Sequence, residues 1–267
     1  IKFYDYNYSS FFIAGQILGT SGYEEAAGAG LLAGINASLY IDNKPWFTLR
    51  RDQAYLGVMI DDLVTKGTKE PYRLLSSRSE YRLITRSDNA DERLIKLGYD
   101  LGLNSKDRYD KYLKRMDELK VAEHALDTIY VGLNEKTPKY LESVGETKPI
   151  GSTSYKDLLK RPKVTYEGLQ QCEPKLPVLS SDLGVKIETN VKYKGYIDLE
   201  EKDVEKMQAM ESLILPQDLD YSKVEGISLE AREKLNKIKP KTIGEASRIT
   251  NVHPADIDRL LFLIRKK

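Results

Sequence analysis

The sequence is poor in the residues from which disulfides and zinc sites are built. Among its 267 residues there is a single cysteine, Cys172, and the only two histidines, His124 and His253, lie far apart in the chain. One cysteine cannot form an internal disulfide framework, and this usage is typical of a reducing compartment. A zinc site of histidine and cysteine ligands is excluded on the same grounds, so we expect no metal site.

The sequence also lacks long apolar runs and an excess of charge of one sign. No run approaches the roughly 20 apolar residues that span a bilayer, and no signal peptide is visible, so we expect a cytoplasmic protein without a membrane segment. The 42 basic and 41 acidic residues nearly cancel, and nucleic acid would therefore have to bind a local patch. The chain starts without methionine and runs directly into an apolar segment, from which we expect the later part of a longer polypeptide.

Small residues gather near the N-terminus, in the segment AGQILGTSGYEEAAGAG of residues 14–30. The bulky residues 10–14 predict a short buried strand, and residues 22–40 predict a helix with Thr20 or Ser21 as its N-cap. A strand, a glycine-rich turn and a helix in this order direct backbone N–H groups and the positive end of the helix dipole toward whatever lies over the turn. An anion or an electron-rich ring would suit that position.

A ridge of small residues, Ala26, Gly30 and Gly34, follows one face of this predicted helix. Glycine in a helix interior costs about 1 kcal/mol relative to alanine, so two glycines on one face indicate the close approach of another backbone or of a ring. Tight packing of the helix on a sheet and contact with a cofactor both fit this pattern, and one helix can do both.

Three arginines, Arg78, Arg82 and Arg86, recur every four residues in the segment SSRSEYRLITRSDNADERL. On a helix or a strand this spacing keeps them on one side, with Tyr81 beside them. Arginine with an aromatic ring is a chemistry for phosphates and bases. A solvated face whose arginines pair with the nearby carboxylates explains the same pattern, and for a charge run it is the commoner explanation.

The rest of the chain predicts helices. Asp88 can cap a helix that ends near Gly102, and Ser105 can cap a longer one. A long helix is expected over residues 182–213, although alternation at its start makes a strand there the second choice. The last fifty or so residues predict three short helices, with N-terminal signals at Ser228, Thr242 and Pro254, that serve packing or partner docking.

Three long motifs resemble the GidA/MnmG family of flavin-dependent tRNA modification enzymes. They are AGQILGTSGYEEAAGAGLLAGINA, RRDQAYLGVMIDDLVTKGTKEPYRLLSSRSEYRLITRSDNADERL and DYSKVEGISLEAREKLNKIKPKTIGEASRITNVHPADI, and together they cover essentially the whole chain. The resemblance implies an α/β fragment, the strand–turn–helix end of a Rossmann-type FAD-binding domain, followed by a mainly α-helical C-terminal region. It implies four parts: the FAD-domain piece over 1–45, a tRNA-facing loop region over 46–87, a helical domain over 88–215 and a three-helix subdomain over 216–267.

The resemblance also implies an activity. Members of the family add a carboxymethylaminomethyl group to C5 of the wobble uridine, using FAD, electrons from NADH and the carbon of methylene-tetrahydrofolate. They work as homodimers with a GTPase partner, MnmE. Five residues are implied to lie near the cofactor: Gly15, Gln16, Thr20, Gly22 and Tyr23. Six basic residues become candidates for the tRNA backbone: Lys66, Lys69, Arg73, Arg78, Arg82 and Arg86.

The chain departs from a complete enzyme of this kind. No G-x-G-x-x-G fingerprint is present to hold the FAD pyrophosphate. The family's catalytic cysteines lie upstream of the matching motifs, and Cys172 lies outside them. We therefore expect the catalytic residues to lie outside this chain, and the chain alone to be inactive.

Two other functions remain open at this point. The folate- and FAD-dependent tRNA uridine-5-methyltransferases share the first motif, but they are shorter after it, so the long helical region favours the wobble-uridine enzymes. A non-catalytic helical module that binds RNA or protein is the second alternative. The glycine-rich opening argues against it, because a pure binding module has no use for half a flavin site.

Overall fold

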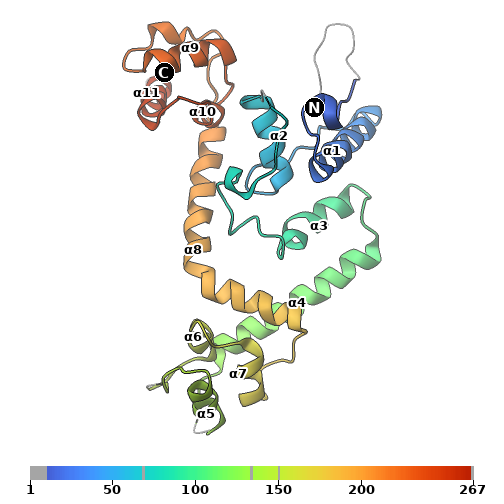
Figure 1. Ribbon diagram of the computed structural model, residues 1–267, viewed down its shortest axis with the longest axis vertical. Helices are drawn as coiled ribbons and strands as arrows, with labels where there is room; N and C mark the ends of the chain where they lie inside the picture. Colours follow the sequence, from blue (N-terminus) through green and yellow to red (C-terminus); the bar gives the residue numbers. More distant parts are fainter. Residues whose placement is uncertain (1–10, 68–69, 133–134, 150, 266–267) are drawn as a thin grey trace. The chain divides into compact units, whose positions relative to one another are not determined.

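The computed structural model describes residues 11–67, 70–132, 135–149 and 151–265 (Figure 1). The described residues form helices joined by turns, with β structure limited to isolated bridges such as Tyr130 with Ser154. In chain order the elements are η1 (Gly15–Leu18), α1 (Tyr23–Ile41), α2 (Tyr55–Thr65), η2 (Ser76–Arg78), α3 (Ala90–Asp100), α4 (Lys106–Thr128), α5 (Lys136–Ser143), α6 (Tyr155–Leu159), α7 (Tyr166–Cys172), α8 (Ser181–Glu211), η3 (Tyr221–Lys223), α9 (Leu229–Ile238), α10 (Ile243–Ser247) and α11 (Pro254–Arg265). None of the described helices is long and apolar enough to cross a membrane.

The predicted fold class is confirmed as a strand–turn–helix fragment followed by helices, with a much reduced strand. Of the residues predicted to form that strand, the described ones contribute a single bridge residue, Phe12, and residue 10 lies outside the described part. The ring of Phe12 packs against Tyr40 and Trp46, with centroids 6.1 and 5.8 Å away, and so fastens this segment to the end of α1.

The chain divides into two compact units, residues 86–199 and residues 1–85 with 200–267. The first of these contains α3 to α7 and the start of α8, around a core of buried leucines and two buried tyrosines, Tyr155 and Tyr166. Ser105 caps α4 as predicted, because its hydroxyl accepts a hydrogen bond from Arg108 N. The prediction that Asp88 caps α3 was wrong, since the helix begins after Asn89.

The long helix α8 settles the choice between helix and strand for its first residues. Ser181–Glu211 is helical throughout, so the alternating apolar residues that suggested a strand do not form one. Ile187, Val191 and Val204 are the helix's buried β-branched residues. Its residues up to 199 belong to one unit and those from 200 onward to the other.

The C-terminal helices begin where the sequence signals predicted. Ser228 accepts from Ala231 N, Thr242 accepts from Glu245 N, and Pro254 is the first residue of α11. The helices α9 to α11 surround one apolar core of twelve buried residues, among them Leu235 and Leu260, both fully buried.

One carboxylate, that of Asp256, closes the N-termini of two of these helices. In a capping box an acid three residues after the N-cap would accept from the N-cap N–H, but α9 has Ala231 there. Asp256 of α11 does this instead, accepting from Ser228 N at 2.8 Å, while its other oxygen accepts from His253 N at 2.9 Å. Burial raises the pKa of Asp256, but these backbone hydrogen bonds outweigh it, and its pKa lies below the ordinary value.

We expect Asp256→Asn to lower the free energy of unfolding at pH 7 by about 1–3 kcal/mol, because an amide keeps one acceptor and loses the charge-assisted bond. The folded-state pKa is lowered, so the stabilisation is complete above the unfolded pKa of about 3.9 and disappears as the pH falls through the folded value. Urea unfolding from pH 7 to 2.5, followed by circular dichroism, measures the difference. The exposed Asp218 gives the control, Asp218→Asn, which we expect to match the wild type; a pH-independent deficit in Asp256→Asn would contradict the assignment.

Two kinds of glycine occur in the first helices. At Gly57 in α2 a Cβ atom would lie 2.1 Å from the carbonyl oxygen of Arg50, so only glycine lets the segment before α2 pack against the helix. At Gly30 and Gly34 a Cβ would meet no described atom within 4 Å. The predicted close contact along the small-residue ridge of α1 is therefore not made by the described residues, and the tight glycine of that helix is Gly28, which faces Leu56.

Candidate functional site

The glycine-rich turn before α1 is a tight 3₁₀ turn, η1, bounded by two glycines with positive φ, Gly15 (+77°) and Gly19 (+82°). Both backbone conformations are ones that side chains with a Cβ rarely adopt. Thr20 is fully buried, and its hydroxyl donates to the carbonyl oxygen of Gly15 at 2.9 Å. Thr20 therefore holds the turn closed from the inside.

The N-terminus of α1 follows directly. Its N-cap is Gly22, not Thr20 or Ser21 as predicted, and no side chain caps it. The buried Glu25 lies against Gly22, since a Cβ there would be 2.0 Å from its Oε2. Gln16 and Tyr23 are exposed, Tyr23 by 94%. The turn thus presents Gln16, Tyr23 and a helix end without a side-chain cap, a surface suited to a planar ring with an electron-rich edge.

The segment 72–74 joins this turn to the basic region. Tyr72 N donates to Gly19 O at 2.8 Å, and Leu74 N donates to Glu25 Oε1 at 2.8 Å. Arg73, between them, is exposed. The two groups of predicted site residues, far apart in the sequence, are therefore neighbours within one unit.

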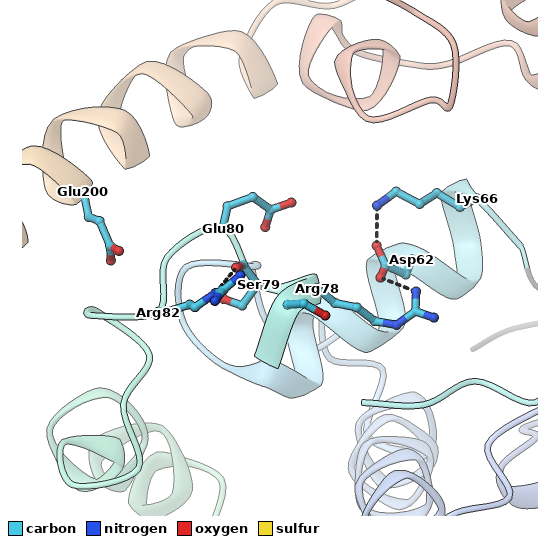
Figure 2. A pocket seen from close by; sticks show the side chains of 8 residues that line it. Asp62, Lys66, Arg78, Ser79, Glu80, Arg82 and Glu200 are labelled. Carbon is cyan, nitrogen blue, oxygen red and sulfur yellow. Dashed lines mark hydrogen bonds and ion pairs between the residues drawn. The ribbon is translucent and has the colours of Figure 1, made fainter. Parts of the chain in front are cut away.

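A pocket of about 690 Å³ lies beside α2 and η2 (Figure 2). Three of its lining residues are basic, namely Lys66, Arg78 and Arg82, and three are acidic, namely Asp62, Glu80 and Glu200. Ser77 and Ser79 complete the lining. By formal charge the lining is balanced, so what it binds depends on which of these charges are already engaged.

The three carboxylates are all engaged by the protein. Asp62, 2% exposed, accepts from Arg51 Nη1 at 2.8 Å, from Lys66 Nζ at 2.9 Å and from the Tyr72 hydroxyl at 3.0 Å. Glu80 forms a two-pronged ion pair with Arg51, at 2.7 and 3.0 Å. Glu200 accepts from the backbone N–H groups that follow Arg82, those of residues 83 and 84, each at 3.0 Å.

The pKa values in this cluster follow from burial and ion pairing. Burial alone would raise the pKa of Asp62, but the hydrogen bonds from Lys66 and Arg51 hold it below the ordinary value. Burial, with the Asp62 charge second, raises the pKa of Tyr72. Tyr72 is therefore a neutral hydrogen-bond donor at neutral pH, and its ring lies 4.5 Å beneath the Arg78 guanidinium.

Arg82 is the cation of this pocket that the protein leaves unpaired. Among the described residues it makes no ion pair, and its one hydrogen bond runs from Nε to Ser79 O at 3.4 Å. Arg78 is held more firmly, by a bond from Nε to Arg73 O at 2.8 Å and by a longer ion pair of 3.7 Å with Asp62. An anion entering the pocket would therefore meet Arg82 with its guanidinium free to form a two-pronged bond.

The arginine row of the sequence is only partly a spatial group. Residues 79–89 form turns, not a helix or strand, so four-residue spacing does not place the three arginines on one face. Arg78 and Arg82 share the pocket, whereas Arg86 belongs to the other unit and pairs with Asp88 at 3.0 Å. The predicted pairing with a nearby carboxylate is confirmed, but the Arg86 side chain is only 14% exposed and does not form a solvated face. Tyr81, which was expected beside the arginines, is buried, with 8% of its surface exposed.

The remaining predicted residues are placed as follows. Lys66 lines the pocket, Arg73 lies on the segment that leads to it, and Lys69 falls outside the described residues. Sequence reasoning missed Arg51, which is buried and binds two carboxylates of the pocket, those of Asp62 and Glu80. The position of Asp62 could have indicated such a residue. Asp62 follows the apolar run of α2, and an acid that is buried there requires a cation to pair with it. Among the described residues no group of three or more metal-ligating side chains was found.

The chain matches family models along most of its length. Residues 6–45 match a family described as Glucose inhibited division protein A. Residues 106–201 match the tRNA modifying enzyme MnmG/GidA C-terminal helical domain, and residues 203–267 match the corresponding C-terminal helical bundle.

Curated relatives and solved structures agree with these matches. The tRNA uridine 5-carboxymethylaminomethyl modification enzyme MnmG of Clostridium kluyveri is 45% identical over 96% of this chain and 41% of its own length, and that of Lactobacillus johnsonii is 46% identical over 97% and 41%. A crystal structure of Aquifex aeolicus GidA superposes with a TM-score of 0.73 at 41% identity, over 94% of this chain and 39% of that one. The chain thus spans about two fifths of the length of the relatives it matches.

Proposed function

The chain belongs to the MnmG/GidA family, and from this we propose that it forms part of an FAD-dependent enzyme that modifies uridine in tRNA. The observation that carries the proposal is Arg82, a cation without an ion pair among the described residues, in a pocket whose carboxylates are all bound from within the protein. An arginine left available in a concave surface suits the phosphates of an RNA backbone. Because the chain spans about two fifths of its relatives, the whole enzyme's activity is part of this proposal.

The finer chemistry is proposed from the family. The parent enzyme would add a carboxymethylaminomethyl group to C5 of the wobble uridine, with electrons from NADH and a carbon from methylene-tetrahydrofolate, as a cytoplasmic homodimer. The relatives from Clostridium kluyveri and Lactobacillus johnsonii are named as enzymes of tRNA uridine 5-carboxymethylaminomethyl modification. This chain alone would be inactive, since it lacks the fingerprint that holds the FAD pyrophosphate.

The glycine-rich turn fits the flavin end of such a cofactor. Bound FAD supplies the electron-transfer chemistry of the reaction. We assign Gln16, Tyr23 and the α1 N-terminus at Gly22 to the surface that faces it, because they are exposed and carry no side-chain cap. Gly15 supplies the positive φ of the turn, and the buried Thr20 positions the turn through its bond to Gly15.

The C-terminal helices would contact the GTPase partner, MnmE. The support is a set of large apolar side chains that remain exposed there although the helices have a complete core of their own, namely Leu229 (77%), Ile238 (40%) and Phe262 (57%). Apolar side chains exposed around a well-packed bundle are typical of a docking surface.

Arg82→Glu tests the tRNA contact. If Arg82 binds a phosphate, reversing its charge lowers the affinity for tRNA about tenfold and lowers the log–log salt slope by about 0.7–0.9, the value of one phosphate contact. Fluorescence anisotropy with a labelled tRNA transcript at 50–200 mM salt measures both. Lys237→Glu on α9 makes the same charge change at an exposed residue far from the pocket in sequence, and we expect wild-type binding from it. An unchanged slope in Arg82→Glu would mean that the arginine is only solvated.

The same substitution, placed in the parent gene, also tests the reaction. A mass-spectrometric nucleoside profile of total tRNA should lose carboxymethylaminomethyl-type wobble uridines. Loss of 5-methyluridine instead would identify the methyltransferase alternative. An unchanged profile together with unchanged binding would favour the non-catalytic helical module.

A further inference from the structure

Arg51 is the most heavily bonded cation near the pocket, yet it is not part of the lining. It is 4% exposed and is bonded to residues 78 and 80 of the loop that carries Arg78 and Arg82. Its guanidinium donates to Glu80, Asp62 and Asp61 and to two carbonyl oxygens, those of Val58 and Arg78. A side chain this buried and this fully bonded cannot itself reach a ligand in the pocket.

We propose that Arg51 is a positioning residue, which with Glu80 as its clamp fixes the loop of residues 78–82 so that Arg78 and Arg82 meet a polyanion together. The inference rests on the proposed tRNA contact of this pocket. By its charge alone, a carboxylate that lines an anion site would repel the anion. The proposal instead gives Glu80 a favourable role, because it helps to hold Arg78 and Arg82 in place.

The bonds of Arg51 restrain both the backbone of Arg78 and, through Asp62 and Tyr72, its guanidinium. Arg51 Nη2 donates to the backbone oxygen of Arg78 at 3.0 Å, which fixes the main chain. Arg51 Nη1 also binds Asp62, which accepts from the Tyr72 hydroxyl, and the Tyr72 ring supports the Arg78 guanidinium. Loss of Arg51 would therefore release both the backbone and the aromatic support of Arg78.

Through Glu80, Arg51 also restrains the backbone close to Arg82. Its two oxygens bind two different nitrogens of Arg51, so its backbone is held on the pocket wall, two residues before Arg82. The next restraint on this loop is Glu200, which accepts from the N–H groups of residues 83 and 84. Arg82 thus lies between two anchored points, and its Nε donates to the backbone oxygen of Ser79 (Figure 2).

Lysine could not replace Arg51 in this role. A guanidinium offers five donors in a planar fork, and here they serve three carboxylates and two carbonyl oxygens. An ammonium keeps the charge but has three donors and no fork, so it cannot bind Glu80 with two prongs and also reach Arg78 O.

Glu80→Gln distinguishes positioning from charge repulsion, because the two roles predict opposite changes in tRNA affinity. Removing a carboxylate from an anion pocket strengthens binding if only Coulomb repulsion matters. If Glu80 positions the arginines through Arg51, the same change weakens binding of a labelled tRNA transcript about three- to tenfold and reduces the salt slope. Glu80 is 46% exposed, so the variant is expected to fold. Glu201→Gln removes an exposed carboxylate that has no bonded partner among the described residues and is the matched control.

Arg51→Lys is the second variant, and Arg82→Ala separates the inference from the proposed function. We expect Arg51→Lys to weaken binding as Glu80→Gln does, and the double variant to be no weaker than either single one. Unchanged or tighter binding in Glu80→Gln would overturn the inference, provided that Arg82→Ala weakens binding. If Arg82→Ala has no effect either, the pocket does not bind tRNA, and both the proposed function and the inference fail.

Discussion

Arg51→Ala is expected to lower the free energy of unfolding by about 3–5 kcal/mol, because it removes the buried guanidinium that Asp61, Asp62 and Glu80 share. Asp62 is 2% exposed and keeps Lys66 and the Tyr72 hydroxyl, but it loses its shortest ion pair. Glu80 loses both of its bonds to Arg51. The loss is larger than that of an exposed pair, since water cannot replace the missing donors at Asp62.

Urea unfolding measures this effect. The single tryptophan, Trp46, belongs to the same compact unit as Arg51, so its fluorescence follows the unit in question. Lys206→Ala is the control, since Lys206 and its partner Asp203 are both mostly exposed, and such a pair contributes at most about 1 kcal/mol. A loss below 1 kcal/mol for Arg51→Ala would mean that Asp62 finds another partner or takes up a proton.

Gly57→Ala is expected to destabilise the protein by about 1–3 kcal/mol, although glycine to alanine in a helix ordinarily stabilises by about 0.5–1 kcal/mol. The new Cβ would lie 2.1 Å from Arg50 O and 2.8 Å from Leu49 O. Both atoms belong to the backbone, and Arg50 O already accepts hydrogen bonds from the N–H groups of residues 53 and 54. The segment must therefore move away from α2, and Arg51 moves with it.

Gly34→Ala is the matched substitution, because Gly34 lies in the interior of α1 with no described atom within 4 Å of a Cβ. We expect this variant to be more stable than the wild type by about 0.5–1 kcal/mol. Unfolding of both variants in urea, followed by circular dichroism, tests the difference in sign. Equal effects would mean that the segment before α2 adapts at little cost.

The sequence predicted those features that depend on local chemistry. The caps at Ser105, Ser228 and Thr242 and the first-position Pro254 follow from orphan N–H groups that any helix must satisfy, and all were confirmed. The cap of α1 was misplaced by one or two residues, because Gly22 serves there without a side-chain bond. Helix ends without a side-chain signal are the ones that pattern reading places poorly.

The pocket could be predicted only in part, because it depends on contacts between distant segments. Arg78 and Lys66 were identified from their residue type, whereas Arg51 acts through Glu80, 29 positions away. The regular spacing of the arginines suggested a shared face, but residues 79–89 form turns, and Arg86 does not line the pocket with the other two. Whether the six basic residues bind tRNA, and whether the turn residues bind flavin, stay predictions.

The shared carboxylate of the C-terminal helices has an evolutionary consequence. Only one of positions 231 and 256 needs to carry an acid. Asp256 accepts the hydrogen bond from the Ser228 N–H at the start of α9, which a glutamate at position 231 would otherwise accept. A chain that loses the acid at 256 can restore a side-chain acceptor for the Ser228 N–H by a glutamate or glutamine at 231, whereas alanine at 231 is free to persist while Asp256 remains. The two positions are therefore expected to vary together among descendants of this sequence, although they lie 25 residues apart and on different helices.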